Sequence, residues 1–290
     1  MVDEARDSSV KEHMRVVLRY VNKKKSVIER FLAVVHVPDT SSHSLKMAID
    51  ALFVQHGLSL SRLRGQGYDG ASNMRGEFNG LKSLILQENP FAMYVHCFSH
   101  QLQLVLVAVA HDNFTVVDLI IQEMNNRFSE VSTELLGCIS CLHPRNSFSQ
   151  FDVDKLIHLV DFYPEDFYGT DYLFLEQQLM SYFYNLRDDP YFSSIDDLGI
   201  LAQKLVETEK HLVFPLVYRM IELTLVLPVA TASIERVFSA MKTVKTDLRN
   251  RMRDEWMNDS LVVYIEKDIF STIENEQILQ HFQQMQSHRI

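Results

Sequence analysis

The sequence predicts an α/β fold in its first part and helices in the rest, which is the class α/β plus α. Over the first 110 residues, strand-like and helix-like segments alternate in the order strand, strand, helix, strand, helix, strand, helix, and such alternation is typical of α/β proteins. Beyond residue 110, apolar residues recur mainly at helical spacing, most regularly from Asp196 onward. We therefore expect three parts, at 1–110, 111–195 and 196–290.

The first part is expected to open with a β-hairpin. Residues 14–21 and 26–37 are rich in Val, Ile, Leu and aromatic residues, and the polar turn 22–25 joins them. A helix over 43–56 follows, because apolar residues recur there every three or four positions, and Gly57 is suited to end it. The inward face of this helix is expected to carry Leu45, Ala48, Ile49, Leu52 and Phe53.

The α/β pattern continues with shorter elements. We expect a strand over 61–67, a helix over 76–88, a strand over 92–97 and a buried helix over 98–110. Asp69 then follows the end of a strand, which is where ligands gather in α/β sheets. The inward residues of the helix over 76–88 are expected to be Phe78, Leu81, Leu84 and Ile85.

Helices dominate the predicted remainder of the chain. The segments with helical character are 115–127, 152–160, 171–186, 196–210 and 212–226, the last of them apolar almost all round. A heptad-like stripe follows, made of Ile234, Val237, Met241, Val244 and Leu248, and Trp256 and Leu261 belong to a further apolar face. We expect these surfaces to mediate self-association. The alternative is that the α/β part covers them within one chain.

The composition is ordinary for a soluble globular chain, with 47% hydrophobic and 23% charged residues. We expect no membrane span, because no uncharged apolar stretch reaches the length of about 18 residues that indicates one. Acidic and basic residues follow Met1 at once, which argues against a secretory signal. Three cysteines are too few for a disulfide framework. Together these features predict an intracellular protein.

Two of the cysteines form a Cys138-x-x-Cys141 pair with His143 close by. Such a pair is half of a zinc site, but no second pair follows at the spacing of a zinc finger. Buried or idle thiols are the other interpretation, and we favour it.

The net charge of −10 argues against a non-specific grip on nucleic acid, which needs many cationic side chains. Basic residues nevertheless gather in one segment, which we call the basic segment. It consists of Arg236, Lys242, Lys245, Arg249, Arg251 and Arg253. A solvated helix face and a nucleic-acid contact are both open interpretations of it. We expect weak or no DNA binding.

Three acidic residues stand out, namely Asp3, Asp69 and Glu235. Carboxylates are the ligands that Mg²⁺ and Mn²⁺ prefer in phosphoryl chemistry. Spacing alone, however, does not separate these three from the other acidic residues of the chain, so solvated surface carboxylates remain the alternative.

Ordered motifs give the sequence a resemblance to the hAT superfamily of DNA transposases. Residues 64–74 (RGQGYDGASNM) resemble the family's second catalytic-aspartate motif, and 96–104 (HCFSHQLQL) resemble its C-x-x-H element. Residues 227–239 (LPVATASIERVFS) resemble the C-terminal signature that carries the catalytic glutamate, and the run to Tyr264 resembles the dimerisation region. In overall character the sequence is similar to plant transposon-derived proteins with a TTF-type or MYM-type zinc finger and a DUF4371-like core.

The resemblance implies an RNase H-like fold with a DDE active site. Asp3, Asp69 and Glu235 would then be the three acids that bind two Mg²⁺ or Mn²⁺ ions. Cys97 and His100 would lie near the active site rather than bind zinc.

The departures from the family pattern shape our expectation of function. Only Met1 and Val2 precede Asp3, so we expect most of the first core strand, as well as a zinc-binding DNA-recognition domain, to be missing. The resemblance thus implies an incomplete RNase H-like core at 1–110, a shortened helical insertion at 111–195 and a dimerisation region at 196–290.

We accordingly expect a domesticated or decayed hAT protein that acts mainly by dimerisation, with itself or with a related hAT-family protein, and that requires no cofactor. Its expected location is the nucleus, or the cytoplasm if no partner supplies a targeting signal. One alternative is an active DDE transposase that uses two divalent metal ions. The other is an RNase H-like nuclease unrelated to transposition.

Overall fold

The computed structural model contains two compact units. Unit 1 comprises Met1, 19–29 and 41–231, and unit 2 comprises 2–18, 30–40 and 232–290. The chain passes from unit 1 to unit 2 at 231/232, and the expected boundary between parts at 195/196 lies inside unit 1. The structure describes residues 1–6, 11–68, 70–76, 78–97, 101, 130–228, 232–246, 249 and 251–286.

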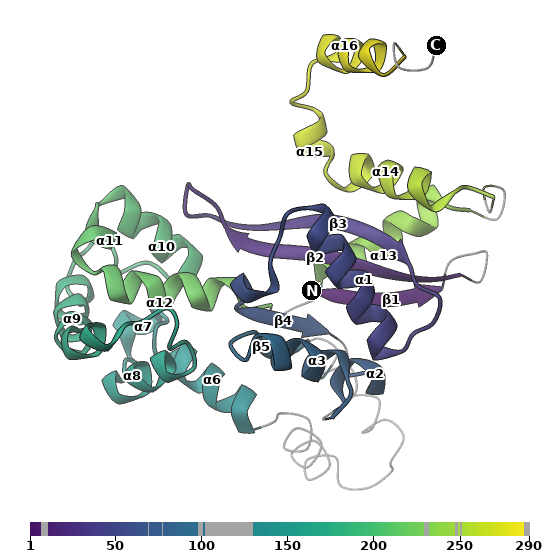
Figure 1. Cartoon of the computed structure of the whole chain (residues 1–290). Coiled ribbons are helices and arrows are strands. Elements are labelled where there is room, and N and C mark those ends of the chain that lie inside the picture. Colours follow the sequence, from purple (N-terminus) through teal and green to yellow (C-terminus); the bar gives the residue numbers. More distant parts are fainter. Residues whose placement is uncertain are drawn as a thin grey trace, which may run out of the picture. The chain divides into compact units, whose positions relative to one another are not determined.

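A three-stranded sheet contains the predicted hairpin (Figure 1). Its strands are β1 (Val2–Arg6), β2 (Glu12–Val21) and β3 (Val27–His36), in the order β1-β2-β3. The turn closes when the N–H of Asn22 donates to the carbonyl of Ser26 at 3.0 Å, with Lys25 at a left-handed φ of 63°. The tip of the hairpin belongs to unit 1 and the rest of both strands to unit 2.

Strand β1 is the part of the chain in which most of the first core strand was expected to be missing. Val2–Arg6 forms a five-residue strand that pairs with β2 along its whole length, antiparallel, from Val2↔Val16 to Arg6↔Glu12. Asp3 therefore lies on a paired strand. Residues 13–17 of β2 are buried without a break, so β1 pairs with a strand that is buried on both faces.

The helices of unit 2 follow the sheet in sequence. They are α13 (Ala232–Val244), α14 (Asp254–Ile265), α15 (Lys267–Phe270) and α16 (Asn275–Gln286). Helix α13 packs on α14. The side chains that fill the core from these two helices are Ile234, Val237, Ala240, Met241, Val244, Met257 and Leu261.

Unit 1 contains a second, two-stranded sheet, in which β4 (Gly65–Tyr68) runs parallel to β5 (Met93–His96). Ahead of it lies α1 (Ser42–Gln55), which begins with the Ser41 side chain accepting the N–H of Ser44 and ends before Gly57 at a φ of 63°. The predicted helix at 43–56 is thus confirmed. A short 3₁₀ turn, η1 (Leu60–Arg62), separates α1 from β4.

Of the helix expected over 76–88 only the second part forms, as α3 (Leu81–Glu88), and a separate short helix, α2 (Ser72–Arg75), precedes it. The N–H of Gly80 donates to the carbonyl of Gly76, and a Cβ on Gly80 would collide with the backbone of Gly76, while one on Gly76 would collide with the carbonyl oxygen of Ser72. This tight turn replaces the first part of the expected helix. Phe78, predicted to face inward, is instead 81% exposed, whereas Leu81 and Ile85 are buried as predicted.

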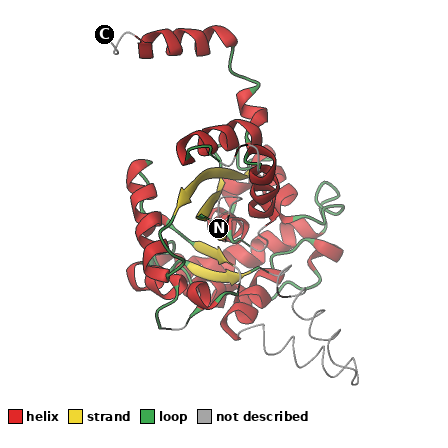
Figure 2. Cartoon of the chain, turned by 90° about the vertical axis from the view of Figure 1, so that its right-hand side faces the viewer, coloured by secondary structure: helices red, strands yellow, loops and turns green. Residues whose placement is uncertain are grey.

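The remaining elements of unit 1 are helices. They are α6 (Glu130–Ser140), α7 (Arg145–Phe148), α8 (Val153–Asp161), α9 (Gly169–Arg187), α10 (Leu198–Glu207), α11 (Lys210–Val213) and α12 (Pro215–Val226). All of them except α11 contribute side chains to one core. Figure 2 shows how much of the described chain is helical. The predicted helices at 152–160, 171–186, 196–210 and 212–226 are confirmed. Those expected at 98–110 and 115–127 lie outside the described residues, apart from Gln101.

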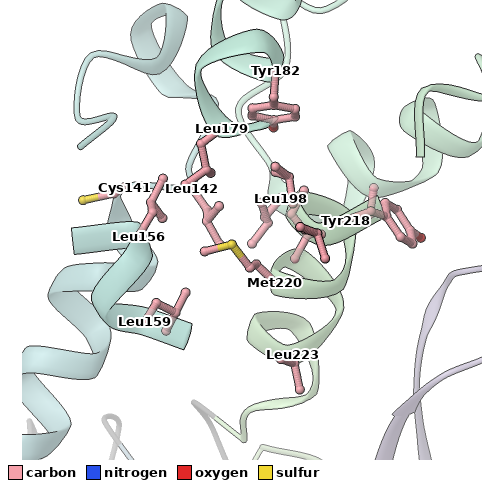
Figure 3. Packing of buried hydrophobic residues seen from close by; sticks show 14 of the residues in the cluster. Cys141, Leu142, Leu156, Leu159, Leu179, Tyr182, Leu198, Tyr218, Met220 and Leu223 are labelled. Atoms are coloured by element: carbon pink, nitrogen blue, oxygen red, sulfur yellow. The ribbon is translucent and has the colours of Figure 1, made fainter. Parts of the chain in front are cut away.

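Helix α12 is covered by the chain itself. It packs against α9 and α10, and Figure 3 shows Met220 of α12 among the side chains of Leu142, Leu179 and Leu198. Tyr182 of α9 is fully buried in the same core. Helix α12 is therefore not part of an uncovered surface, which removes it from the expected dimer contact, whereas Leu212 and Val213 ahead of it are 69% and 64% exposed.

Candidate functional site

The motif at 64–74 and the motif at 227–239 meet in unit 1. A Cβ added to Gly65 would lie 2.9 Å from Cδ of Pro228, and one added to Gly67 would lie 2.8 Å from its Cγ. Both distances are shorter than real Cβ contacts, so only glycine at these two positions lets Pro228 lie on β4. The two glycines of the first motif are thus explained by the proline of the second.

The third motif joins the same place. In the parallel pair, Tyr68 at the end of β4 lies beside His96 at the end of β5, and a Cβ on Gly70 would lie 2.9 Å from Cε1 of His96. Cys97, which follows β5, is buried. Three segments that are distant in sequence, and that resemble family motifs, therefore lie together along β4 and β5.

A polar network holds these strands in place. The Tyr68 hydroxyl donates to Oε1 of Gln66 at 2.7 Å, and Nε2 of Gln66 donates to the carbonyl of Ala92 at 2.8 Å. Arg64, just ahead of β4, binds both carboxylate oxygens of Asp166, which lies between α8 and α9. This two-pronged contact ties the motif strand to the helices of unit 1.

The second candidate cluster lies in unit 2, around Asp3. Asp3 and Arg15 are directly opposite each other in the β1–β2 pair, so their side chains emerge on the same face of the sheet. Oδ2 of Asp3 lies 3.5 Å from Nη1 of Arg15, and Oδ1 accepts the N–H of Glu4 at 2.9 Å. Asp3 keeps a side-chain exposure of 21%, whereas Arg15 is fully buried.

Helix α13 covers Arg15 from the other side. The guanidinium carbon of Arg15 lies 3.2 Å from the ring centroid of Phe238, and its Nη2 lies 4.0 Å from Sδ of Met241. Burial lowers the pKa of Arg15 to about 10, against the opposing effect of the Asp3 carboxylate. Arg15 is therefore still a cation at neutral pH, and it is held between the sheet and an aromatic ring.

The other two acids of the expected catalytic set are only partly placed. Asp69 follows β4, as predicted, but lies outside the described residues, as does His100. Glu235 lies in α13, one turn before Phe238, and its side chain is outside the described part. Among the residues that are described, no group of three or more His, Cys, Asp or Glu side chains is arranged to hold a metal ion.

The Cys138–Cys141 pair lies in the helical core of unit 1. Both cysteines are buried, and Sγ of Cys141 donates to the carbonyl of Gly137 at 3.4 Å. Burial raises the pKa of both thiols, which disfavours the thiolate that zinc requires. Of the two interpretations from the sequence, buried thiols describe what the structure shows.

The basic segment is mostly a solvated surface. Lys245 is buried, and the other five cations are exposed.

The described part of the chain contains no helix long and apolar enough to span a membrane.

The predicted dimerisation residues divide into a buried and an exposed set. Ile234, Val237, Met241, Val244 and Leu261 are all less than 10% exposed and form the core of unit 2. Leu248 lies outside the described residues. Trp256 is 71% exposed. The alternative from the sequence, that the chain itself covers the heptad stripe, therefore describes this structure, and a surface role is left to Trp256.

Exposed apolar side chains continue beyond Trp256 along the last three helices. We call them the C-terminal apolar face: Trp256, Val263, Tyr264, Ile269, Phe270, Ile273, Ile278, Leu279 and Phe282, each at least 38% exposed. Trp256 and Val263 are seven residues apart, or about two helical turns, and so lie on one side of α14. Met257 and Leu261 on the other side are buried.

Side chains of the C-terminal helices also bind the edge of the sheet. Oδ1 of Asn258 accepts the N–H of Val34 at 2.9 Å, and Oε1 of Glu266 accepts the N–H of Phe31 at 2.9 Å. At the start of α14, the carboxylate of Asp254 lies 3.2 Å from Nζ of Lys11 and 3.4 Å from Nε2 of the buried His13. These contacts fix α14 to β2 and β3.

Comparison with protein families agrees with the motifs. A family model described as a ZMYM1/FAM200, RNase-like domain (DUF4371) matches residues 1–80, and a model of the hAT family C-terminal dimerisation region matches residues 193–269. The chain is an hAT-like, transposase-derived protein. The dimerisation match of this hAT-like chain begins before α10, ends within α15, and so contributes to both units.

Sequence reasoning missed Arg15, the residue that most changes the interpretation of Asp3. A signal was present, because Arg15 is a single charge inside the apolar run from Met14 to Leu18. A charge at such a position is almost never fully buried unless it is paired, so the run itself points to an acidic partner.

Proposed function

We propose that this hAT-like chain functions as a homodimer, and that the C-terminal apolar face forms the contact between the two copies. The observation that carries the proposal is the 71% exposure of Trp256 within the segment that matches the hAT dimerisation region. Exposed tryptophan is uncommon on a free surface, and Trp is among the residues that dominate the binding energy of interfaces.

The burial and the hydrogen bonds of α14 support its role in a protein–protein interface. Its buried side, with Met257 and Leu261, is satisfied by unit 2 itself, and its N-terminal end and Asn258 are bonded to the sheet. The helix is thus held rigidly while Trp256 and Val263 face solvent. An apolar group presented by a fixed element loses little conformational entropy on binding.

Helix α16 extends this surface. Ile278, Leu279 and Phe282 are spaced at i, i+1 and i+4, so they lie on one side of the helix, and each is exposed. Because no packed neighbour of the described chain covers this side, α16 has little to stabilise it alone. A second copy of the same face would supply the missing apolar partner, as expected for a twofold symmetric contact.

The test is the oligomeric state of the full chain across a dilution series, measured by sedimentation equilibrium. The wild-type chain is expected to dimerise, and Trp256→Ala to weaken the dimer by about 2 kcal/mol or more, roughly 30-fold in Kd. Phe78→Ala is the matched control, because Phe78 is an equally exposed aromatic residue of unit 1. A wild-type monomer at every concentration, or equal effects of the two substitutions, would contradict the proposal.

DNA cleavage is the competing function. Two observations favour it: β1 exists as a paired strand that carries Asp3, and Glu235 lies on a regular helix. We infer that the chain does not cleave DNA, because the charge facing Asp3 is a buried arginine of its own. An assay for this inference is set out in the Discussion.

A further inference from the structure

The carboxylate of Asp3 does not fit the role of a metal ligand in this chain. Its Oδ1 is engaged by the N–H of Glu4, and its Oδ2 faces the guanidinium of Arg15. A ligand of Mg²⁺ or Mn²⁺ has to turn an oxygen lone pair toward the ion at about 2.0–2.1 Å. Here the guanidinium of Arg15 occupies the space on the buried side of Asp3.

We propose that Arg15 is a built-in counter-ion for Asp3, which takes the electrostatic place of a divalent cation and keeps Asp3 from binding Mg²⁺ or Mn²⁺. This inference goes beyond the proposed dimer, whose contact surface lies on other residues, and it stands or falls separately. It concerns only Asp3 and Arg15, both of them in unit 2.

The surroundings of Arg15 keep its side chain beside Asp3. The two residues are fixed opposite each other by the backbone register of β1 and β2, not by a flexible loop. The guanidinium is fully buried and stacked on Phe238. To move aside for a metal ion, it would have to leave the aromatic ring and enter space already filled by the core of unit 2.

Charge favours the same arrangement. A buried cation is costly unless an opposite charge compensates it, and Nε and Nη1 of Arg15 are buried without a hydrogen-bond acceptor among the described residues. The coulombic attraction of Asp3 therefore matters to Arg15. A metal ion on Asp3 would withdraw that compensation and add repulsion between two cations sharing one carboxylate. The pair and the metal ion exclude each other.

The experiment measures Mn²⁺ binding to the full chain by electron paramagnetic resonance, in which free Mn²⁺ gives the signal. Wild type and Asp3→Asn are expected to bind Mn²⁺ equally, because Asp3 takes no part. Arg15→Met fills the same space without charge and is expected to gain a site at least roughly tenfold tighter than any in wild type. The double variant Arg15→Met/Asp3→Asn is expected to lose it.

The controls separate charge from packing. Arg15→Lys retains a cation and is expected to behave like wild type, and Arg15→Gln is a second neutral variant in case Arg15→Met does not fold, as judged by circular dichroism. Wild-type Mn²⁺ binding that disappears in Asp3→Asn would overturn the inference. So would folded Arg15→Met or Arg15→Gln that gains no site dependent on Asp3. The dimer measurement on the same samples reports on the proposed function independently.

Discussion

The side chain of Asn258 on α14 accepts the backbone N–H of Val34 on β3, with 2.9 Å between Oδ1 and the amide nitrogen. Strand β3 ends the sheet order β1-β2-β3, and the free N–H groups of such an end strand are open to pairing with other chains. Glu266 binds a second amide of β3, that of Phe31. Helix α14 and the residue that ends it thus act as a partial cover for the edge of the sheet.

The contact of Asn258 with Val34 predicts a specific loss of stability. Asn258→Ala removes the acceptor and leaves the N–H of Val34, a buried residue, without its partner, which is expected to cost about 1–3 kcal/mol in the free energy of unfolding. Asn258→Asp retains an acceptor oxygen and is expected to cost less. Urea unfolding followed by circular dichroism measures both, and an Asn258→Ala variant as stable as wild type would refute the role of this bond.

Much of the local structure could be predicted from the sequence, because it depends on short-range patterns. The hairpin, α1, α8, α9 and α12 all follow from alternation or helical spacing within 10 to 20 residues. The prediction of a helix over 76–88 was wrong in its first part, also for a local reason. Periodicity placed Phe78 inward, but the tight turn from Gly76 to Gly80 contains Phe78, and α3 begins only after it, at Leu81.

The candidate sites depended on long-range contacts that periodicity does not reveal. The heptad stripe of α13 predicts that Val237 must be covered, but not whether a second copy or the same chain covers it. Likewise, Arg15 can be recognised as an anomaly in its strand, yet only the register of β1 on β2 shows that it faces Asp3. The resemblance to transposases identified the motifs at 64–74 and 227–239. The structure shows that they are in contact, because Pro228 of the second motif packs on the glycines of the first.

We expect no DNA cleavage by the purified chain. The reason is the engagement of Asp3 by Arg15, since displaced catalytic groups typically lower rates by orders of magnitude. The measurement is incubation of the chain with DNA that carries terminal inverted repeats in the presence of Mn²⁺. The control is Asp69→Asn, and cleavage by wild type that this variant abolishes would show that the active site is intact.

Any DNA binding is expected to be weak and indifferent to sequence. Five exposed cations of the basic segment are set against a net charge of −10 for the whole chain. Binding through phosphate contacts alone falls steeply with salt, so a fluorescence-anisotropy titration should show affinity lost by about 200 mM salt. The double variant Arg249→Ala/Arg251→Ala should reduce the salt dependence. Tight binding that persists at that salt concentration would mean that another surface recognises DNA.

His158 predicts a small pH dependence of stability in unit 1. Its ring nitrogens lie 3.1 Å from Asp161 on the same helix, α8, and 2.9 Å from Glu134 on α6, so the second contact links the two helices. These hydrogen bonds raise the pKa of His158 above 6.5. A raised pKa means that the charged form stabilises the fold below the unfolded value of about 6.5, and that this contribution is lost as the pH rises through the folded pKa.

The effect of His158 is expected to be less than about 1 kcal/mol, because the three side chains are about half exposed. Unfolding free energies of wild type and His158→Gln, measured in urea at about pH 5.5 and about pH 9, provide the test. Wild type should be the more stable of the two at the lower pH, and the difference should shrink at the higher pH. A difference that grows with pH would reverse the sign of the argument.

The last prediction separates the core of unit 2 from its surface. Val237 of α13 is fully buried, whereas Trp256 of α14 is largely exposed, although both belong to the segment expected to dimerise. Val237→Asp places an unpaired charge in an apolar core and is expected to cost at least about 3 kcal/mol in the free energy of unfolding. Val237→Ala, which only removes two methyl groups, is expected to cost roughly 1–2 kcal/mol.

Trp256→Asp should leave the monomer folded and abolish its association, because a solvated aspartate costs the monomer little, whereas in the dimer contact it would be buried. Thermal unfolding and sedimentation of the three variants distinguish these outcomes. If Val237→Asp stays folded and loses only the dimer, the heptad stripe is the interface and the C-terminal apolar face is not.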